Sequence, residues 1–109
     1  MDAFATPCPA DPVPTVDDLD RDFWAEGMAM FVHNALSPWL GLVDPARYAA
    51  EVDRVHAMNM TAIATAHSPL ISAASIDDAF RLLRDLPAVP APPAPDQTTL
   101  AAILRGAAL

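Results

Sequence analysis

Hydrophobic residues recur at helical spacing in the first third of the chain. Ser37-Pro38 ends this stretch, because the residue before a proline is pushed out of the α region. An acidic run precedes it and suits the positive end of a helix dipole. The pattern therefore predicts a helix over residues 20–36. Its apolar face comprises Phe23, Trp24, Gly27, Met28, Phe31 and Ala35.

A second helix is predicted over residues 44–58. Asp44 followed by Pro45 places a capping carboxylate directly before a proline at the first helical position. The apolar stripe that follows is narrow and fades towards the end of the range. It consists of Tyr48, Val52 and Val55.

Two more helices are predicted in the last third of the chain. Ser75, with Asp78 three residues on, resembles a capping box and predicts a helix over residues 76–86. Asp96 is expected to cap a last short helix over residues 97–105.

The run at residues 60–66 has a different character, because β-branched side chains alternate with small alanines. This composition is typical of a short strand buried on both faces. Such a strand needs hydrogen-bonding neighbours, so we expect its partner to lie outside this chain. The fold class is then mainly α with one short β-strand, a partial α/β arrangement. The alternative is that the run forms a loop or extends a helix.

Composition narrows the classes of partner. The chain has 109 residues, a formal net charge of −8 and no lysine among its six basic residues. An acidic surface repels phosphates and anionic lipids, so we expect no nucleic acid and no membrane partner. A single cysteine, Cys8, and a start that lacks the pattern of a signal peptide indicate a cytoplasmic protein.

Residues that could carry chemistry are few. The sequence lacks H-x-H, H-x-E and C-x-x-C spacing, and it lacks a nucleophile elbow or a phosphate loop. We therefore assign no catalytic residue and no cofactor-binding residue. His67 directly follows the predicted strand, where functional groups gather in α/β sheets. The other two histidines, His33 and His56, are expected to be surface or edge residues of helices.

Two segments resemble the last two metal-ligand motifs of metallo-β-lactamase-fold proteins. They are Asp2-Ala3-Phe4 and the run from Ala64 to Pro69, Ala-Thr-Ala-His-Ser-Pro. The oxygen-binding di-iron branch, related to the flavodiiron proteins, is the most similar. The resemblance implies that residues 1–86 are the C-terminal portion of a metallo-β-lactamase αβ/βα fold. Residues 87–109 then form a Pro/Ala-rich strap and a short C-terminal helix.

By this resemblance, Asp2 would bridge two iron ions and His67 would be a terminal ligand to one of them, with zinc as an alternative metal. Ala5 and Ser68 stand where that family has glycine. The first ligand cluster of the family and its middle histidine have no counterpart here. Two ligands cannot hold a two-metal site, so we expect the chain alone not to retain the metals.

Two main functional hypotheses follow. In the first, the chain is a fragment of a di-metal oxidoreductase or hydrolase and is inactive alone. It would then complement a missing or separately encoded N-terminal half, or self-associate through exposed apolar helix faces. In the second, the chain is a small acidic helical protein-interaction module without catalysis.

Overall fold

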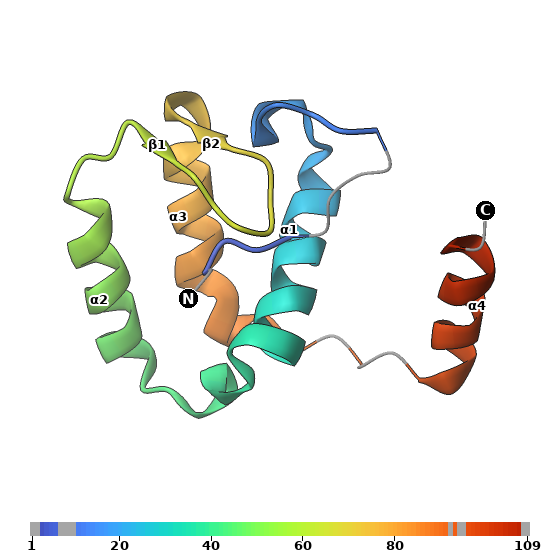
Figure 1. Cartoon of the computed structure of the whole chain (residues 1–109). Coiled ribbons are helices and arrows are strands. Elements are labelled where there is room, and N and C mark those ends of the chain that lie inside the picture. The colour runs from blue at the N-terminus through green and yellow to red at the C-terminus, as the bar shows by residue number, and fades with distance from the viewer. Residues whose placement is uncertain (1–2, 7–10, 92, 94–95, 108–109) are drawn as a thin grey trace.

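The computed structural model describes residues 3–6, 11–91, 93 and 96–107. This part of the chain is mainly helical with one short β element, as the sequence predicts. Three helices pack side by side, a short pair of strands lies near one end of them, and a fourth helix stands apart (Figure 1). The helices are α1 (Arg21–Phe31), α2 (Pro45–His56), α3 (Ile76–Asp85) and α4 (Gln97–Ala107), and the strands are β1 (Ala62–Ile63) and β2 (Ile71–Ser72).

Aspartate side chains begin three of the four helices, which confirms the predicted caps at Asp44 and Asp96. The carboxylates accept hydrogen bonds from backbone amides of the first turn: Asp20 from Phe23 at 3.0 Å, Asp44 from Arg47 at 3.0 Å and Asp96 from Thr99 at 2.7 Å. Ser75 directly precedes α3 as predicted, but its side chain makes no capping hydrogen bond to the helix. A 3-10 turn precedes α3, and the Ser75 hydroxyl donates instead to the carboxylate of Asp17.

The first predicted helix changes its winding before it ends. The α-helical part stops at Phe31, and residues Val32–Leu36 continue as a π-helix. His33, on this π-helical turn, is only 6% exposed, and its Nε2 donates to the carbonyl oxygen of Leu86 at 2.7 Å. The expectation that His33 lies at the surface is therefore wrong. Its side chain ties the end of α1 to the end of α3.

The β element corrects the prediction for residues 60–66. Only Ala62–Ile63 are in a strand, and Ala62 is exposed, so the run is not buried on both faces. β1 pairs antiparallel with β2, with Ala62 opposite Ser72 and Ile63 opposite Ile71. The partner strand therefore comes from this chain, and the expectation of an external one is wrong. The chain reverses direction between the two strands, so that β1 and β2 hydrogen-bond to each other.

The helices bury their apolar faces against one another. Trp24 and Met28 of α1, Val52 of α2 and Phe80 of α3 are each less than a tenth exposed. These apolar faces are covered within the chain, because α2 packs on α3 and the side chains of Trp24, Val52 and Phe80 share one core. Phe23, by contrast, remains 37% exposed.

Tyr48 links α2 to α3 and makes the stability of the fold sensitive to alkaline pH. Its hydroxyl donates to the Leu83 carbonyl oxygen at 2.6 Å, and burial raises the pKa of Tyr48 to about 12. Because the folded state keeps the phenol protonated, the free energy of unfolding should fall as pH rises from about 10 to about 12. The phenol is only partly buried, and contact with water limits the fall to about 1–2 kcal/mol.

Between about pH 10 and 12 the signal of Tyr48 is free of other tyrosines and of lysines, because the chain has one tyrosine and no lysine. Urea unfolding at a series of pH values, with the phenolate absorbance as a second signal, checks the expected fall. Tyr48→Phe should unfold with no such dependence between about pH 10 and 12. An identical alkaline loss of stability in this variant would contradict the assignment to Tyr48.

α4 lies apart from the body formed by α1, α2 and α3 (Figure 1). The Cα radius of gyration is 14.7 Å, above the ~13 Å expected for a compact chain of this length. Two leucines of α4 stay exposed in this position, Leu100 at 43% and Leu104 at 58%. The fourth helix therefore adds little to the core of its own chain.

Candidate functional site

Of the two predicted metal ligands, the structure describes only His67. His67 is exposed and lies in the loop between β1 and β2. The Thr6 amide donates to the His67 carbonyl oxygen at 3.1 Å, so the N-terminal segment runs beside this loop. Asp2 lies outside the described residues. No group of three or more potential metal ligands occurs within the described ranges, and the ligand roles of Asp2 and His67 remain predictions.

A groove lies between α1 and the C-terminal end of α3 and is here termed the α1–α3 groove. Its volume is about 500 Å³. Four residues on two successive turns of α1 form one wall. Residues of α3 and of the turn after it form the other wall. The lining residues are Ala25, Glu26, Ala29, Met30, Leu82, Asp85, Leu86 and Val89.

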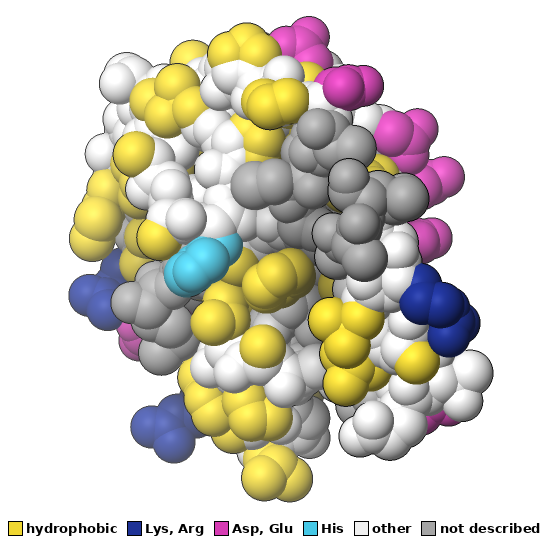
Figure 2. Space-filling model, turned by 45° about the vertical axis from the view of Figure 1, so that its right-hand side comes forward, with side chains coloured by type: hydrophobic (Ala, Val, Ile, Leu, Met, Phe, Trp, Pro, Cys, Tyr) yellow, Lys and Arg dark blue, Asp and Glu magenta, His cyan; other side chains and the backbone are white. Residues whose placement is uncertain are grey.

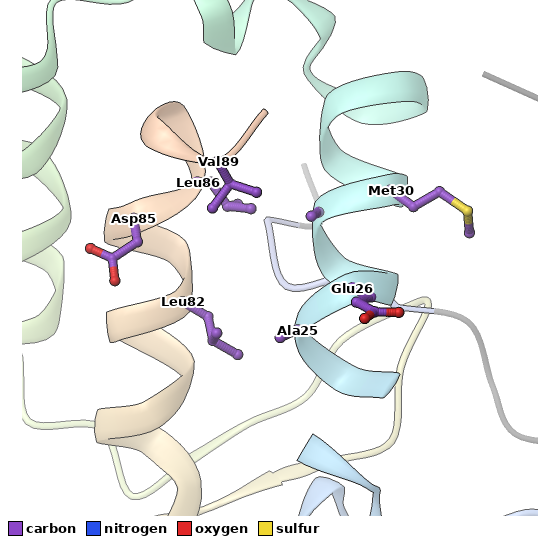
Figure 3. Close-up of a pocket in the computed structure, with 8 residues that line it drawn as sticks. Ala25, Glu26, Met30, Leu82, Asp85, Leu86 and Val89 are labelled. Atoms are coloured by element: carbon purple, nitrogen blue, oxygen red, sulfur yellow. The ribbon is translucent and has the colours of Figure 1, made fainter. Parts of the chain in front are cut away.

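Helical spacing explains why this groove is apolar. Ala25 and Ala29 lie one turn apart on α1, and their small side chains leave room between the helices. Opposite them, Leu82, Leu86 and Val89 follow one another at i, i+4 and i+7. Figure 3 shows these three side chains in the space between the two helices. The His33–Leu86 hydrogen bond fixes the distance between the walls at this end.

The charged residues of the groove lie on its flanks. Figure 3 shows Asp85 on the side of α3 that faces away from α1, and Glu26 on the outer side of α1. Both residues are exposed, and none of the eight lining residues is basic. An apolar floor between two carboxylates suits a ligand with an apolar face and positive charge beside it.

The apolar surface continues around α1. Phe23 and Met30, each 37% exposed, border a second, smaller hollow with Gly27. Figure 2 shows several groups of hydrophobic side chains on one face of the molecule, with acidic side chains along its upper right edge. The exposed apolar residues of α1 therefore extend the area that a partner could cover.

A polar hollow between α2 and α3 is, by contrast, occupied by its own side chains. Arg84 pairs with Asp53 at 3.1 Å, and His56 Nε2 lies 2.8 Å from Asp77 Oδ1. The His56 ring also stacks on Phe80, with ring centroids 4.4 Å apart. These side chains pair with one another across the two helices, so the polar groups named here already have partners within the chain. His56 is half-buried here, at the edge of the core as expected.

Charged and polar side chains on another part of the surface also connect separate elements of the fold. The Arg21 guanidinium bonds to Asp78 at 2.7 Å and lowers the pKa of that carboxyl. The hydroxyls of Ser72 and Ser75 lower the pKa of Asp17 in the same way. These contacts link α1 and the turn before it to the start of α3.

Sequence reasoning did not identify the groove. One signal was available, since Ala25 and Ala29 make a small-residue notch on an otherwise large apolar face. The chain matches no protein-family model, no curated protein and no solved structure. Within the described part of the chain, every helix is too short or too polar to cross a bilayer.

Proposed function

We propose that the chain is a small acidic protein-interaction module that binds an amphipathic helix in the α1–α3 groove. The observation that carries the proposal is the shape and lining of this groove: an apolar floor, small residues on α1, and a carboxylate on each flank. Helix-in-groove recognition uses apolar anchors at i and i+4 or i+7 in such a channel. A basic residue on the flank of the partner helix would pair with Glu26 or Asp85.

The lining favours a helix over a small molecule. Pockets for small ligands combine an apolar wall with a few polar groups that converge on the ligand. The two carboxylates of this groove diverge from its floor instead (Figure 3). The single cysteine supports a cytoplasmic location for this module.

Two synthetic helical peptides test the proposal. Both carry leucines at i and i+4; one has arginines on the flanks of this stripe, and the other has glutamates at the same positions. We expect calorimetry to show binding of the arginine peptide at least about tenfold tighter than that of the glutamate peptide. Absence of binding by the arginine peptide, or equal binding by both, would contradict the proposal.

A second candidate function keeps the resemblance to the metallo-β-lactamase fold, as a fragment of a di-iron or dizinc protein. One contact favours it: the Thr6 amide bonds to the His67 carbonyl oxygen, so the segment that follows Asp2 lies beside the loop that holds His67. The fragment would take its remaining ligands from a missing N-terminal half.

Elemental analysis after gel filtration with iron or zinc tests this second candidate. The purified chain should retain less than one metal per chain, because Asp2 and His67 alone supply too few ligands. His67→Ala should lower even this weak binding. Unchanged metal binding in this variant would remove His67 from the site.

A further inference from the structure

α4 has the properties of a helix that needs a partner surface. Leu100 and Leu104 lie one turn apart and are largely exposed, with Arg105 beside them. An isolated helix of 11 residues is marginal in water even with good helix formers, because nucleation is costly. The Asp96 cap lowers this cost but buries no apolar surface. Docking of the leucines would supply the missing stabilisation.

The apolar and charged parts of α4 match the α1–α3 groove. The leucine pair presents two anchors at i and i+4, as the groove requires. The sequence of α4 carries one basic residue, Arg105, and no acidic residue. The α4 helix can therefore approach the carboxylates of Glu26 and Asp85 without repulsion from acidic residues of its own, although the whole chain carries a net charge of −8. The α4 helix is about 16 Å long, which suits a groove formed over about two helical turns.

The strap before α4 decides which groove it reaches. Residues 90–96 contain four prolines, and such sequences favour extended conformations of about 3 Å per residue. This proline-rich part directly follows Val89, which itself lines the groove. A stiff segment that leaves the rim would have to reverse within seven residues to return α4 to its own groove. In the structure α4 lies away from the body instead (Figure 1).

We propose that the α1–α3 groove binds α4 of a second copy of this chain, so that two copies exchange their C-terminal helices. The exchange is reciprocal, because each copy offers one groove and one α4, and a twofold axis satisfies both. This inference rests on the proposed function and names the partner of the same groove. Net repulsion between two acidic chains opposes it, but salt screens that repulsion beyond about 8 Å.

Analytical ultracentrifugation of the full chain over a concentration series tests the exchange. We expect a monomer–dimer equilibrium. Leu100→Gln/Leu104→Gln removes the anchors from α4, and Ala25→Arg/Val89→Arg blocks the groove. Each double variant should raise the dimer dissociation constant at least about tenfold. Mixing the two variants should restore a heterodimer, since one chain keeps its groove and the other keeps its α4.

The possible outcomes separate this inference from the proposed function. A wild-type chain that stays monomeric, or dimers that persist in both double variants, would overturn the exchange. If the Leu100→Gln/Leu104→Gln chain nevertheless binds the arginine peptide, the groove is a binding site for another partner helix. If that chain binds no peptide, the proposed function fails as well. Circular dichroism of both variants confirms that the body remains folded.

Discussion

Replacing Phe80 with alanine is expected to lower the free energy of unfolding by about 3–5 kcal/mol. Phe80 is 2% exposed and is among the largest fully buried side chains of the described residues. Its ring meets Phe4 edge-on, with centroids 5.3 Å apart, and stacks on His56 of α2. One side chain thus holds the N-terminal segment, α2 and α3 together, so its loss leaves a cavity that three elements share.

Urea denaturation measures this loss, and Phe23→Ala is the matched control. Phe23 is 37% exposed on α1, so the same truncation there should cost less than about 1.5 kcal/mol. Domains of this size are stable by only about 5–15 kcal/mol, so Phe80→Ala should shift the midpoint strongly. Equal losses in the two variants would show that the core is not centred on Phe80.

The local signals in the sequence predicted the helices well. A capping carboxylate acts on amides within its own first turn, so Asp44 and Asp96 could be recognised without knowledge of the rest of the chain. The apolar stripe of α1 likewise predicted the burial of Trp24 and Met28. These features depend on residues three or four positions apart.

The features that were missed depend on contacts between different elements of the chain. The pairing of Ile63 with Ile71 requires a reversal of the chain, and Val16 donates to the Leu70 carbonyl oxygen from a distant segment. Such contacts carry no local periodicity. The run at residues 60–66 therefore suggested a strand without showing that its partner was nearby.

The candidate site was missed for the same reason. The α1–α3 groove combines Ala25 and Ala29 with residues more than fifty positions later. The position of His33 was also unpredictable, because only the π-helical turn and the carbonyl of Leu86 explain its burial. Sequence reasoning favoured Asp2 and His67 instead, through short motifs whose metal-binding role stays a prediction.

Placing positive charge in the α1–α3 groove is expected to produce the largest effect on binding. Ala25→Arg/Val89→Arg puts two guanidinium groups where a cationic helix would lie. The arginine peptide should then bind at least about thirtyfold more weakly, because like charges repel at contact distance and the apolar floor is covered. The fold should persist, since Ala25 is only partly buried and Val89 is 39% exposed.

A control variant of identical chemistry lies on another face. Ala50→Arg/Val55→Arg makes the same two replacements on α2, where Ala50 is exposed and Val55 is 36% exposed. Its net charge equals that of the groove variant, so long-range electrostatics affects both equally. Any difference between the two variants therefore reports on the groove itself.

The affinity of the arginine peptide for these two variants, measured by calorimetry in the same buffer, tests the central claim most directly. The groove variant should lose most of its binding, and the α2 variant should stay within about threefold of the unmodified chain. Equal affinities for both variants would contradict the claim that the α1–α3 groove is the site where this chain binds its partner.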